Sequence, residues 1–215
     1  MKIKYMGHSA FIIEHKNRLI IDPYIETIPE VDYVLVTHAH NDHFGNTIEI
    51  AKKNNAKVIS IYEIAEFVKQ FNIESIGMNF GGTIDIGEKV SLVPAVHSST
   101  LYYNGKAYPL GNPGGFVIKG NKTIYHAGDT MVFKDMELIG ELFKIDVALL
   151  PIGGVFTMDI DQALKAIDLL KPKIVIPMHY NTWPIIKADP YEFKRKAEEK
   201  GVEAIVLNKD EEIDL

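Results

Sequence analysis

The sequence predicts an α/β protein in which two mixed β-sheets pack face to face and helices cover their outer sides. Three observations lead to this fold class. Strand segments and helices recur in a similar order in the two parts of the chain, the composition is 47% hydrophobic and 24% charged, and 215 residues suffice for one large domain. We expect a single domain over residues 1–215, with two pseudo-symmetric halves at about 1–110 and 115–215.

The first part of the chain opens with strands and continues with helices between strands. Apolar segments bounded by Gly, Asn and Pro predict strands at residues 2–6, 10–14, 18–21, 33–37, 57–61, 74–80, 83–86 and 89–96. Helical periodicity predicts helices at 47–54 and 62–70. The segment 102–115 is rich in Gly, Asn, Pro and Tyr and has no clear period, so we expect a long loop there that divides the halves.

The second part repeats this order. Strands are predicted at residues 116–119, 122–126, 146–150, 174–177 and 204–207, and helices at about 134–142, 159–170 and 190–200. Asp189 is placed to cap the last helix, with Pro190 in its first turn and Gly201 at its end. Asp159 and Gln162 have the spacing of a capping pair for the preceding helix.

The composition narrows the classes of function. Lys and Arg number 23 against 29 Asp and Glu, and a formal net charge of −6 disfavours a nucleic-acid partner. The chain has no cysteine, which excludes disulfides, thiolate zinc sites and iron–sulfur clusters, so a metal would have to be held by His, Asp or Glu. No apolar run is long enough for a signal peptide or a membrane span, and we expect a cytoplasmic protein with no membrane partner.

The stretch "THAHNDHFGN" at residues 37–46 is the densest group of titratable side chains. It follows an apolar strand, at the kind of edge where functional groups are commonly placed. His38 and His40 are two residues apart, so in extended backbone both rings point to one side and can share an ion. Asp42 and His43 follow where the chain must turn and can reach a second point nearby. An exposed polar loop would not be expected to gather so many ligand-type residues.

Other strand ends supply the further ligands that this cluster needs. The segments "LVPAVHSST", "TIYHAGDT" and "IVIPMHYNTWP" each end an apolar run in ligand-type residues, namely His97, His126 with Asp129, and His179. Each of these histidines taken alone is more often structural, but together with the cluster they indicate a metal site. Asn181 and Trp183, which follow His179, are candidate pocket residues.

The motifs "IIDPY", "THAHNDH", "VPAVH", "HAGDT" and "IPMHY" occur in the order of the metallo-β-lactamase fold, and the chain resembles that superfamily over nearly its whole length. The opening "YMGHSAF" and the closing "PMHYNTWP" are similar to those of short stand-alone metal-dependent hydrolases of bacteria and archaea, relatives of ascorbate-phosphate lactonases. The resemblance implies a four-layer αββα sandwich with the metals at one edge. It also suggests a homo-oligomer.

Carried over by motif, the resemblance implies two divalent ions, most simply zinc, with manganese or iron as alternatives. The implied ligands are His38, His40 and His97 for the first ion, Asp42, His43 and His179 for the second, and Asp129 between them. Asp22 would be a buried structural acid beside the site. The chain also differs from some members of the superfamily. The absence of cysteine argues against a true β-lactamase, and 215 residues leave no room for a flavin domain or a nuclease insertion.

The expected activity is hydrolysis. A hydroxide bridging two metals would attack an ester, lactone or phosphoester of a small metabolite. Asp42 would orient the hydroxide or accept its proton, and His126 or His8 would assist the leaving group. Two alternatives stay open, namely a phosphodiesterase or ribonuclease using the same centre and an iron-dependent redox or dioxygenase protein. The sequence leaves the substrate, the metal and the roles of His8 and His126 undecided.

Overall fold

The computed structural model describes residues 1–215 and contains two seven-stranded mixed sheets packed against each other. The first sheet has the spatial order β16 (Glu212–Asp214), β1 (Lys2–Gly7), β2 (Ala10–Glu14), β3 (Arg18–Ile21), β4 (Tyr33–Val36), β5 (Lys57–Ile61) and β6 (Ser75–Met78). The second has the order β15 (Glu203–Ala204), β14 (Ile174–Met178), β13 (Val147–Pro151), β12 (Thr123–His126), β11 (Gly114–Lys119), β8 (Lys89–Pro94) and β7 (Thr83–Asp85).

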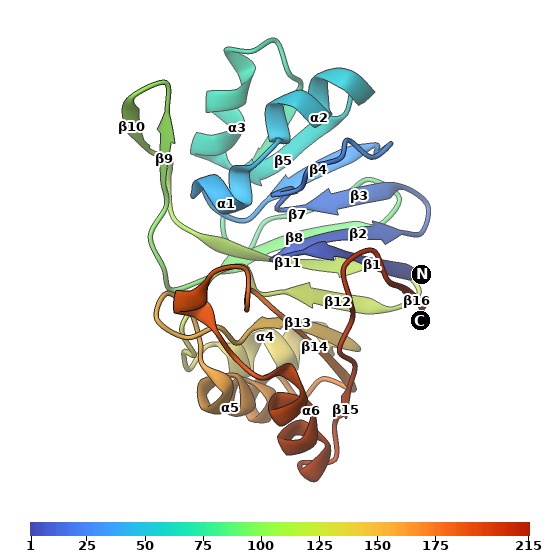
Figure 1. The fold of residues 1–215 in the computed structure, drawn as a ribbon. Coiled ribbons are helices and arrows are strands. Elements are labelled where there is room, and N and C mark those ends of the chain that lie inside the picture. The colour runs from blue at the N-terminus through green and yellow to red at the C-terminus, as the bar shows by residue number, and fades with distance from the viewer.

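Helices form the two outer layers, as Figure 1 shows. Beside the first sheet lie α1 (Asn41–Phe44), α2 (Thr47–Asn54) and α3 (Tyr62–Lys69), and beside the second lie α4 (Met136–Phe143), α5 (Ile160–Leu170) and α6 (Pro190–Glu199). A short 3-10 helix, η1 (Pro184–Ile186), follows β14. This arrangement confirms the predicted αββα sandwich. None of the helices has the length and apolar character needed to cross a membrane.

Each sheet changes from antiparallel to parallel pairing along its width. In the first sheet β3, β4, β5 and β6 are parallel, and in the second β12, β13, β14 and β15 are parallel. Strands of the parallel parts are continuous apolar runs, such as "VALLP" in β13 with all five residues buried, because sheet and helices cover both faces. A core of 60 buried residues draws on both sheets and on the helices.

Helix ends follow the predicted capping residues. The carboxylate of Asp159 accepts a hydrogen bond from the backbone N–H of Gln162 at 2.8 Å, and that of Asp189 accepts one from Tyr191 at 2.9 Å. The last helix begins at Pro190, and Gly201 follows its end with a φ of 80°. These two caps are therefore confirmed.

Some elements differ from the sequence-based expectation. The segment predicted as a long loop contains a hairpin of β9 (Thr100–Tyr103) and β10 (Lys106–Pro109), which projects from the sandwich in Figure 1. Its turn residues, Asn104 and Gly105, have φ values of 48° and 72°, as expected where an Asn-Gly pair closes a two-residue turn. The strand predicted at 204–207 is instead the short β15, and β16 was not predicted.

The two sheets do not divide where that segment lies. The chain crosses from the first sheet to the second between β6 and β7, and β16 returns to the first sheet beside β1. Consequently β7 and β8, which precede residue 110, belong to the second sheet. The edge at which β4, β8, β12 and β14 end is where the candidate site forms.

Candidate metal centre

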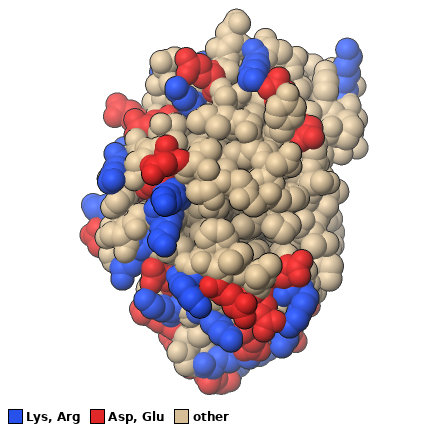
Figure 2. Space-filling model, turned by 180° about the vertical axis from the view of Figure 1, so that it is seen from behind, with Lys and Arg blue, Asp and Glu red and all other residues tan.

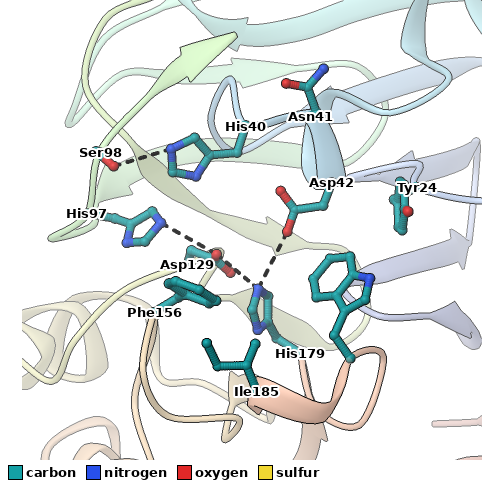
Figure 3. Close-up of a pocket in the computed structure, with 11 residues that line it drawn as sticks. Tyr24, His40, Asn41, Asp42, His97, Ser98, Asp129, Phe156, His179 and Ile185 are labelled. Carbon is teal, nitrogen blue, oxygen red and sulfur yellow. Dashed lines mark hydrogen bonds and ion pairs between the residues drawn. The ribbon is translucent and has the colours of Figure 1, made fainter. Parts of the chain in front are cut away.

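Strand ends from both sheets deliver the predicted ligand residues to one place. His38 lies two residues after β4, His97 three residues after β8, Asp129 three residues after β12, and His179 directly after β14. His40, Asp42 and His43 lie at the start of α1, which turns the chain back over the same edge. Figure 3 shows His40, Asp42, His97, Asp129 and His179 pointing toward a common centre. All seven residues implied as ligands are therefore brought together.

One group of possible ligand atoms consists of His38, His40, His97 and Asp129, all within 4.8 Å of one another. Nε2 of His38 lies 3.0 Å from Nδ1 of His40. Oδ2 of Asp129 lies 3.5 Å from Nε2 of His97 and 3.9 Å from Nε2 of His38. Three ring nitrogens and one carboxylate thus converge, which is a donor set that divalent metals accept.

A second group consists of His8, Asp42, His43 and His179, also within 4.8 Å. Oδ2 of Asp42 lies 3.8 Å from Nε2 of both His43 and His179. Asp129 reaches this group as well, because its Oδ1 lies 3.1 Å from Nε2 of His43 and its Oδ2 lies 3.1 Å from Nε2 of His179. The carboxylate of Asp129 therefore faces both groups.

Polar atoms at the centre are buried without hydrogen-bond partners. Nε2 of His43, Nε2 of His179 and Oδ1 of Asp129 are shielded from solvent and make no hydrogen bond. Leaving such atoms unpaired costs about 1–3 kcal/mol each, and native proteins rarely do so without an ion or water at the site. Ring nitrogens and carboxylate oxygens are ligands of divalent metals, so the residues present fit a metal.

Asp22 lies behind this centre, and its carboxylate accepts hydrogen bonds from three donors. Its carboxylate accepts from the backbone N–H of Thr37 at 2.8 Å, the hydroxyl of Thr37 at 2.6 Å and Nδ1 of His43 at 2.7 Å. Because Nδ1 of His43 donates to Asp22, Nε2 is the nitrogen that faces Asp129, and it becomes available to a metal when its own proton is released. Because the Thr37 hydroxyl donates its hydrogen bond to Asp22, its oxygen accepts a hydrogen bond from Nδ1 of His38 at 3.0 Å. Asp22 thus fixes the tautomers of two candidate ligands.

Burial and charge set the protonation of the histidines. Burial lowers the pKa of His38, His40 and His97, so these rings are neutral, as metal binding requires. Burial would also lower the pKa of His179, but the carboxylate of Asp129 outweighs it and raises that pKa to about 9. For the same reason the pKa of His43 lies well above its ordinary value, with Asp129 and Asp22 as the opposing charges.

His8 lies beside Asp42 and away from the open pocket. It is buried, and its Nε2 lies 3.1 Å from Oδ2 of Asp42 while its Nδ1 lies 2.8 Å from the hydroxyl of Thr182. The carbonyl of His8 accepts from the backbone N–H of His179 at 2.8 Å and from the hydroxyl of Tyr5 at 3.1 Å. These bonds hold a left-handed backbone with φ of 54°, so the ring is fixed in direction.

His126 does not suit the predicted role in proton transfer. Its Nε2 donates to the carbonyl of Ser9 at 2.9 Å, and its Nδ1 accepts from the backbone N–H of Gly128 at 3.1 Å. The ring is fully buried and is not among the residues that line the pocket. Both nitrogens are engaged by the backbone, so His126 has no free nitrogen for a leaving group. It holds the loop that carries Asp129.

The centre opens into a pocket of about 560 Å³. The lining residues come from loops of both sheets: Tyr24, His40, Asn41, Asp42, His97, Ser98, Asp129, Phe156, His179, Trp183 and Ile185. Trp183 was predicted as a pocket residue, whereas the side chain of Asn181 instead accepts a hydrogen bond from the backbone of Ala188 at 3.0 Å. Phe156 and Ile185 carried no sequence signal, because an apolar loop residue has no motif of its own, and Tyr24 ends the motif "IIDPY" but was not predicted to line a pocket.

Comparisons with known proteins establish the class of protein. The Beta-lactamase superfamily domain matches residues 10–180. A UPF0173 metal-dependent hydrolase of Pyrococcus abyssi is 50% identical, covering 100% of both chains, and another of Methanosarcina mazei is 44% identical, covering 100% of this chain and 99% of the relative.

A solved structure agrees with these relatives. The structure of Igni18, described as a novel metallo hydrolase of the archaeon Ignicoccus hospitalis, has a TM-score of 0.91 and 42% identity, over 99% of this chain and 97% of that one. The chain therefore belongs to the metallo-β-lactamase superfamily, within its stand-alone metal-dependent hydrolases. Its His and Asp groups are able to bind metal.

Proposed function

We propose that the protein hydrolyses an ester, lactone or phosphoester of a small metabolite at two divalent metal ions, with zinc as the expected metal. The observation that carries the proposal is the position of Asp129. Its Oδ1 lies 3.1 Å from His43 and its Oδ2 lies 3.1 Å from His179 and 3.5 Å from His97, so one carboxylate serves both groups.

The proposed ligands follow the two groups. His38, His40 and His97 would hold one ion and Asp42, His43 and His179 the other, with Asp129 available to both, whereas His8 of the second group is engaged by Asp42 and Thr182. Bound divalent ions supply a lowered pKa for coordinated water and a positive charge that polarises a carbonyl or phosphoryl oxygen. In the reaction, the water oxygen bonds to the acyl carbon or phosphorus, the bond to the leaving oxygen breaks, and a proton of the water ends on that oxygen.

Asp42 orients the attacking water rather than storing its proton. Burial would raise the pKa of Asp42, but His179 and His8 outweigh it and hold that pKa below its usual value. A carboxylate with so low a pKa is a weak base but a good hydrogen-bond acceptor. Asp42 lines the pocket while its Oδ2 accepts from His8, which leaves the other oxygen available to a water beside the substrate.

Substitution of the bridging residue tests the proposal. We expect Asp129→Asn and His40→Ala to lower kcat/KM by at least about a thousandfold, an effect on the scale of losing a charge-stabilising group, with unchanged circular dichroism. Metal analysis of protein purified without added metal should give two ions per wild-type chain and fewer in Asp129→Asn. The matched control is His15→Ala, because His15 lies in the turn after β2 and outside the site. A folded Asp129→Asn protein with full turnover would refute the proposal.

A further inference from the structure

The pocket wall beyond the candidate ligands is apolar. Tyr24, Phe156, Trp183 and Ile185 form it, and the remaining lining residues are histidines, Asp, Asn and Ser. No lysine or arginine lines the pocket. In Figure 3, Phe156 and Ile185 lie near His179 while Tyr24 lies on the far side of Asp42, so the wall flanks the centre on two sides.

These apolar side chains are unusually open to solvent. The exposed fraction is 50% for Phe156, 57% for Ile185 and 42% for Tyr24. Large apolar side chains gathered at the mouth of a pocket, next to a candidate reactive centre, are typical of a surface that a ligand covers. Other parts of the surface are dominated by charged side chains. Figure 2, which views the molecule from behind the view of Figure 1, shows them crowded in its lower region.

Two backbone turns hold the wall in place. The loop of Phe156 is closed by a bond from the N–H of Gly154 to the carbonyl of Met158 at 3.0 Å, and Met158 is tied to Thr130 at 3.0 Å. The N–H of Ile186 donates to the carbonyl of Trp183 at 3.1 Å, and the Trp183 ring packs 4.9 Å from that of His8. A preformed wall spares a ligand the cost of ordering it.

A charged group would find no partner on this wall. Lys209 is in a second cavity that also includes Tyr24 and His8, and its amine lies 3.7 Å from the carboxylate of Glu26. Burying an anion against Phe156 and Ile185 would remove its hydration without replacing it. Recognition of a phosphate or carboxylate away from the reacting bond normally uses Arg, Lys or backbone N–H groups.

We propose that the substrate is a neutral carboxylic ester or lactone whose non-reacting part is an aromatic or aliphatic group seated against Tyr24, Phe156, Trp183 and Ile185. The reacting carbonyl then faces the His and Asp centre. Hydrolysis adds water across the acyl carbon–oxygen bond and yields a carboxylic acid and an alcohol. The choice of reacting bond rests on the proposed function, whereas the seat for the apolar group does not.

A series of γ-lactones that share one ring tests the reaction. The ring is compared unsubstituted and carrying a methyl, butyl, phenyl or carboxylate group. For the purified metal-containing protein we expect kcat/KM to rise about fourfold for each methylene that is buried, and the carboxylate derivative to be at least about tenfold poorer than the butyl one. Equal rates along the series, or faster turnover of the carboxylate derivative or of a sugar phosphate, would overturn the inference.

Trp183 gives a second test that needs no turnover, because it is the only tryptophan in the chain. We expect phenylacetamide to change the fluorescence of Trp183 at a concentration at least about tenfold lower than gluconamide does, since the two neutral amides differ in the apolar part. Saturable binding of phenylacetamide by a protein that hydrolyses no ester, lactone or phosphoester would refute the proposed function and keep the apolar seat. No preference between the two amides would refute the seat.

Variants of the wall test whether the apolar group of the substrate binds at this wall or to exposed apolar surface in general. In Phe156→Ala and Ile185→Ala we expect the ratio of kcat/KM for the phenyl lactone to that for the unsubstituted ring to fall about tenfold, on the scale of removing a large apolar contact. Ile185→Lys should shift preference toward the carboxylate derivative. The control Leu142→Ala removes a similarly exposed side chain from α4, with an exposed fraction of 67%, and should leave the ratio unchanged. An equal loss in the control would contradict the inference.

Discussion

At the residue scale, two hydrogen bonds run in series from Thr182 through His8 to Asp42. Asp42 is ionised and can only accept, so Nε2 of His8 carries the proton and Nδ1 accepts from the Thr182 hydroxyl. This order fixes the tautomer of His8 and directs Oδ2 of Asp42 toward His43 and His179, each 3.8 Å away. We therefore infer that His8 is a positioning residue that acts through Asp42, in place of the predicted assistance to the leaving group.

Thr182→Val tests this chain, since valine keeps the shape of threonine and removes its hydroxyl. Without that donor Nδ1 of His8 is left unpaired and the ring is held less firmly against Asp42, so we expect metal affinity or kcat to fall about 10- to 100-fold, as for other residues that orient a ligand. Affinity is measured by competition with a chelator, and kcat on the best lactone. Thr182→Ser should restore both values, and failure of serine to do so would argue against the hydroxyl.

His8→Gln distinguishes a positioning residue from a metal ligand, because His8 also lies within the second group of possible ligand atoms. The glutamine amide can still donate to Asp42 but is a poor replacement for an imidazole ligand. We expect His8→Gln to retain two ions per chain by metal analysis. Loss of one ion in the folded variant would assign His8 as a ligand instead.

The residues of the site differ in how far the sequence could predict them. His38, His97 and His179 are predictable because ligand-type residues that end apolar strands leave a visible pattern. Thr182 has no such pattern, since its role depends on a ring that lies 174 positions away in the chain. His126 shows the opposite case, because a histidine near Asp129 suggests chemistry but is used by the backbone.

At the scale of elements, the strands that were predicted well are those with continuous apolar runs, such as β4 and β13. The hairpin of β9 and β10 was missed because it stands out from the sandwich and its residues need not alternate between core and solvent. Helix α1 has only four residues, too few to show a helical period. Helix α1 is thus defined by contacts outside the segment, whereas the Asn104-Gly105 pair was a local signal for the turn of the hairpin.

The turn between β2 and β3 of the first sheet contacts the turn between β7 and β8 of the second sheet, and this contact links the two sheets. The carboxylate of Glu88 is buried and accepts hydrogen bonds from the backbone N–H groups of Lys16 and Asn17 and from the side chain of Asn17, at 2.5, 3.1 and 2.7 Å, while Nδ1 of His15 lies 3.2 Å away. Burial would raise the pKa of Glu88, but these donors outweigh it and lower that pKa.

Glu88→Gln should therefore destabilise the fold by about 1–3 kcal/mol. Only the oxygen of the glutamine amide can accept from these donors, and its NH₂ group would face donors instead of accepting from them. A depressed carboxyl pKa stabilises the native state above the pKa of the unfolded chain, and this stabilisation is lost as pH falls through the folded pKa. Urea unfolding at pH 7 and pH 3 should show the difference between wild type and variant shrinking at pH 3. The control Glu14→Gln alters an exposed pair with Arg18 and should change little.

At the scale of the whole molecule, the order of elements predicts the sandwich, but the partition of strands between sheets is set by pairing between distant segments. β16 joins β1 across almost the whole chain, and β7 pairs with β8 in the second sheet while its predecessor β6 stays in the first. Local pattern contains no information on such pairings. The superfamily motifs supply it indirectly, because they fix which strand ends must meet.

The candidate ligands come from both sheets, so a bound metal connects the two sides of the sandwich. His38 and His43 follow β4 of the first sheet, whereas Asp129 and His179 follow β12 and β14 of the second. A metal that binds only the folded chain stabilises it by about 4 kcal/mol at a thousandfold excess over Kd. For a chain of this size about 1 kcal/mol raises Tm by about 2–4 °C, so we expect zinc to raise Tm by about 8–16 °C.

This stabilisation should depend on pH. The pKa of His179 is raised to about 9 and that of His43 is also raised, because the carboxylate of Asp129 opposes the effect of burial. An incoming ion must displace the protons that these two rings hold, so zinc binding releases protons and its apparent affinity falls as pH falls below about 9. We expect the difference in Tm between zinc-loaded and chelator-treated protein to be larger at pH 8 than at pH 6. Calorimetry in two buffers of different ionisation enthalpy measures the released protons. Asp129→Asn should lose most of the zinc effect. A Tm shift in that variant equal to the wild-type shift would show that zinc binds elsewhere. A wild-type Tm shift that is the same at both pH values would show that zinc displaces no protons.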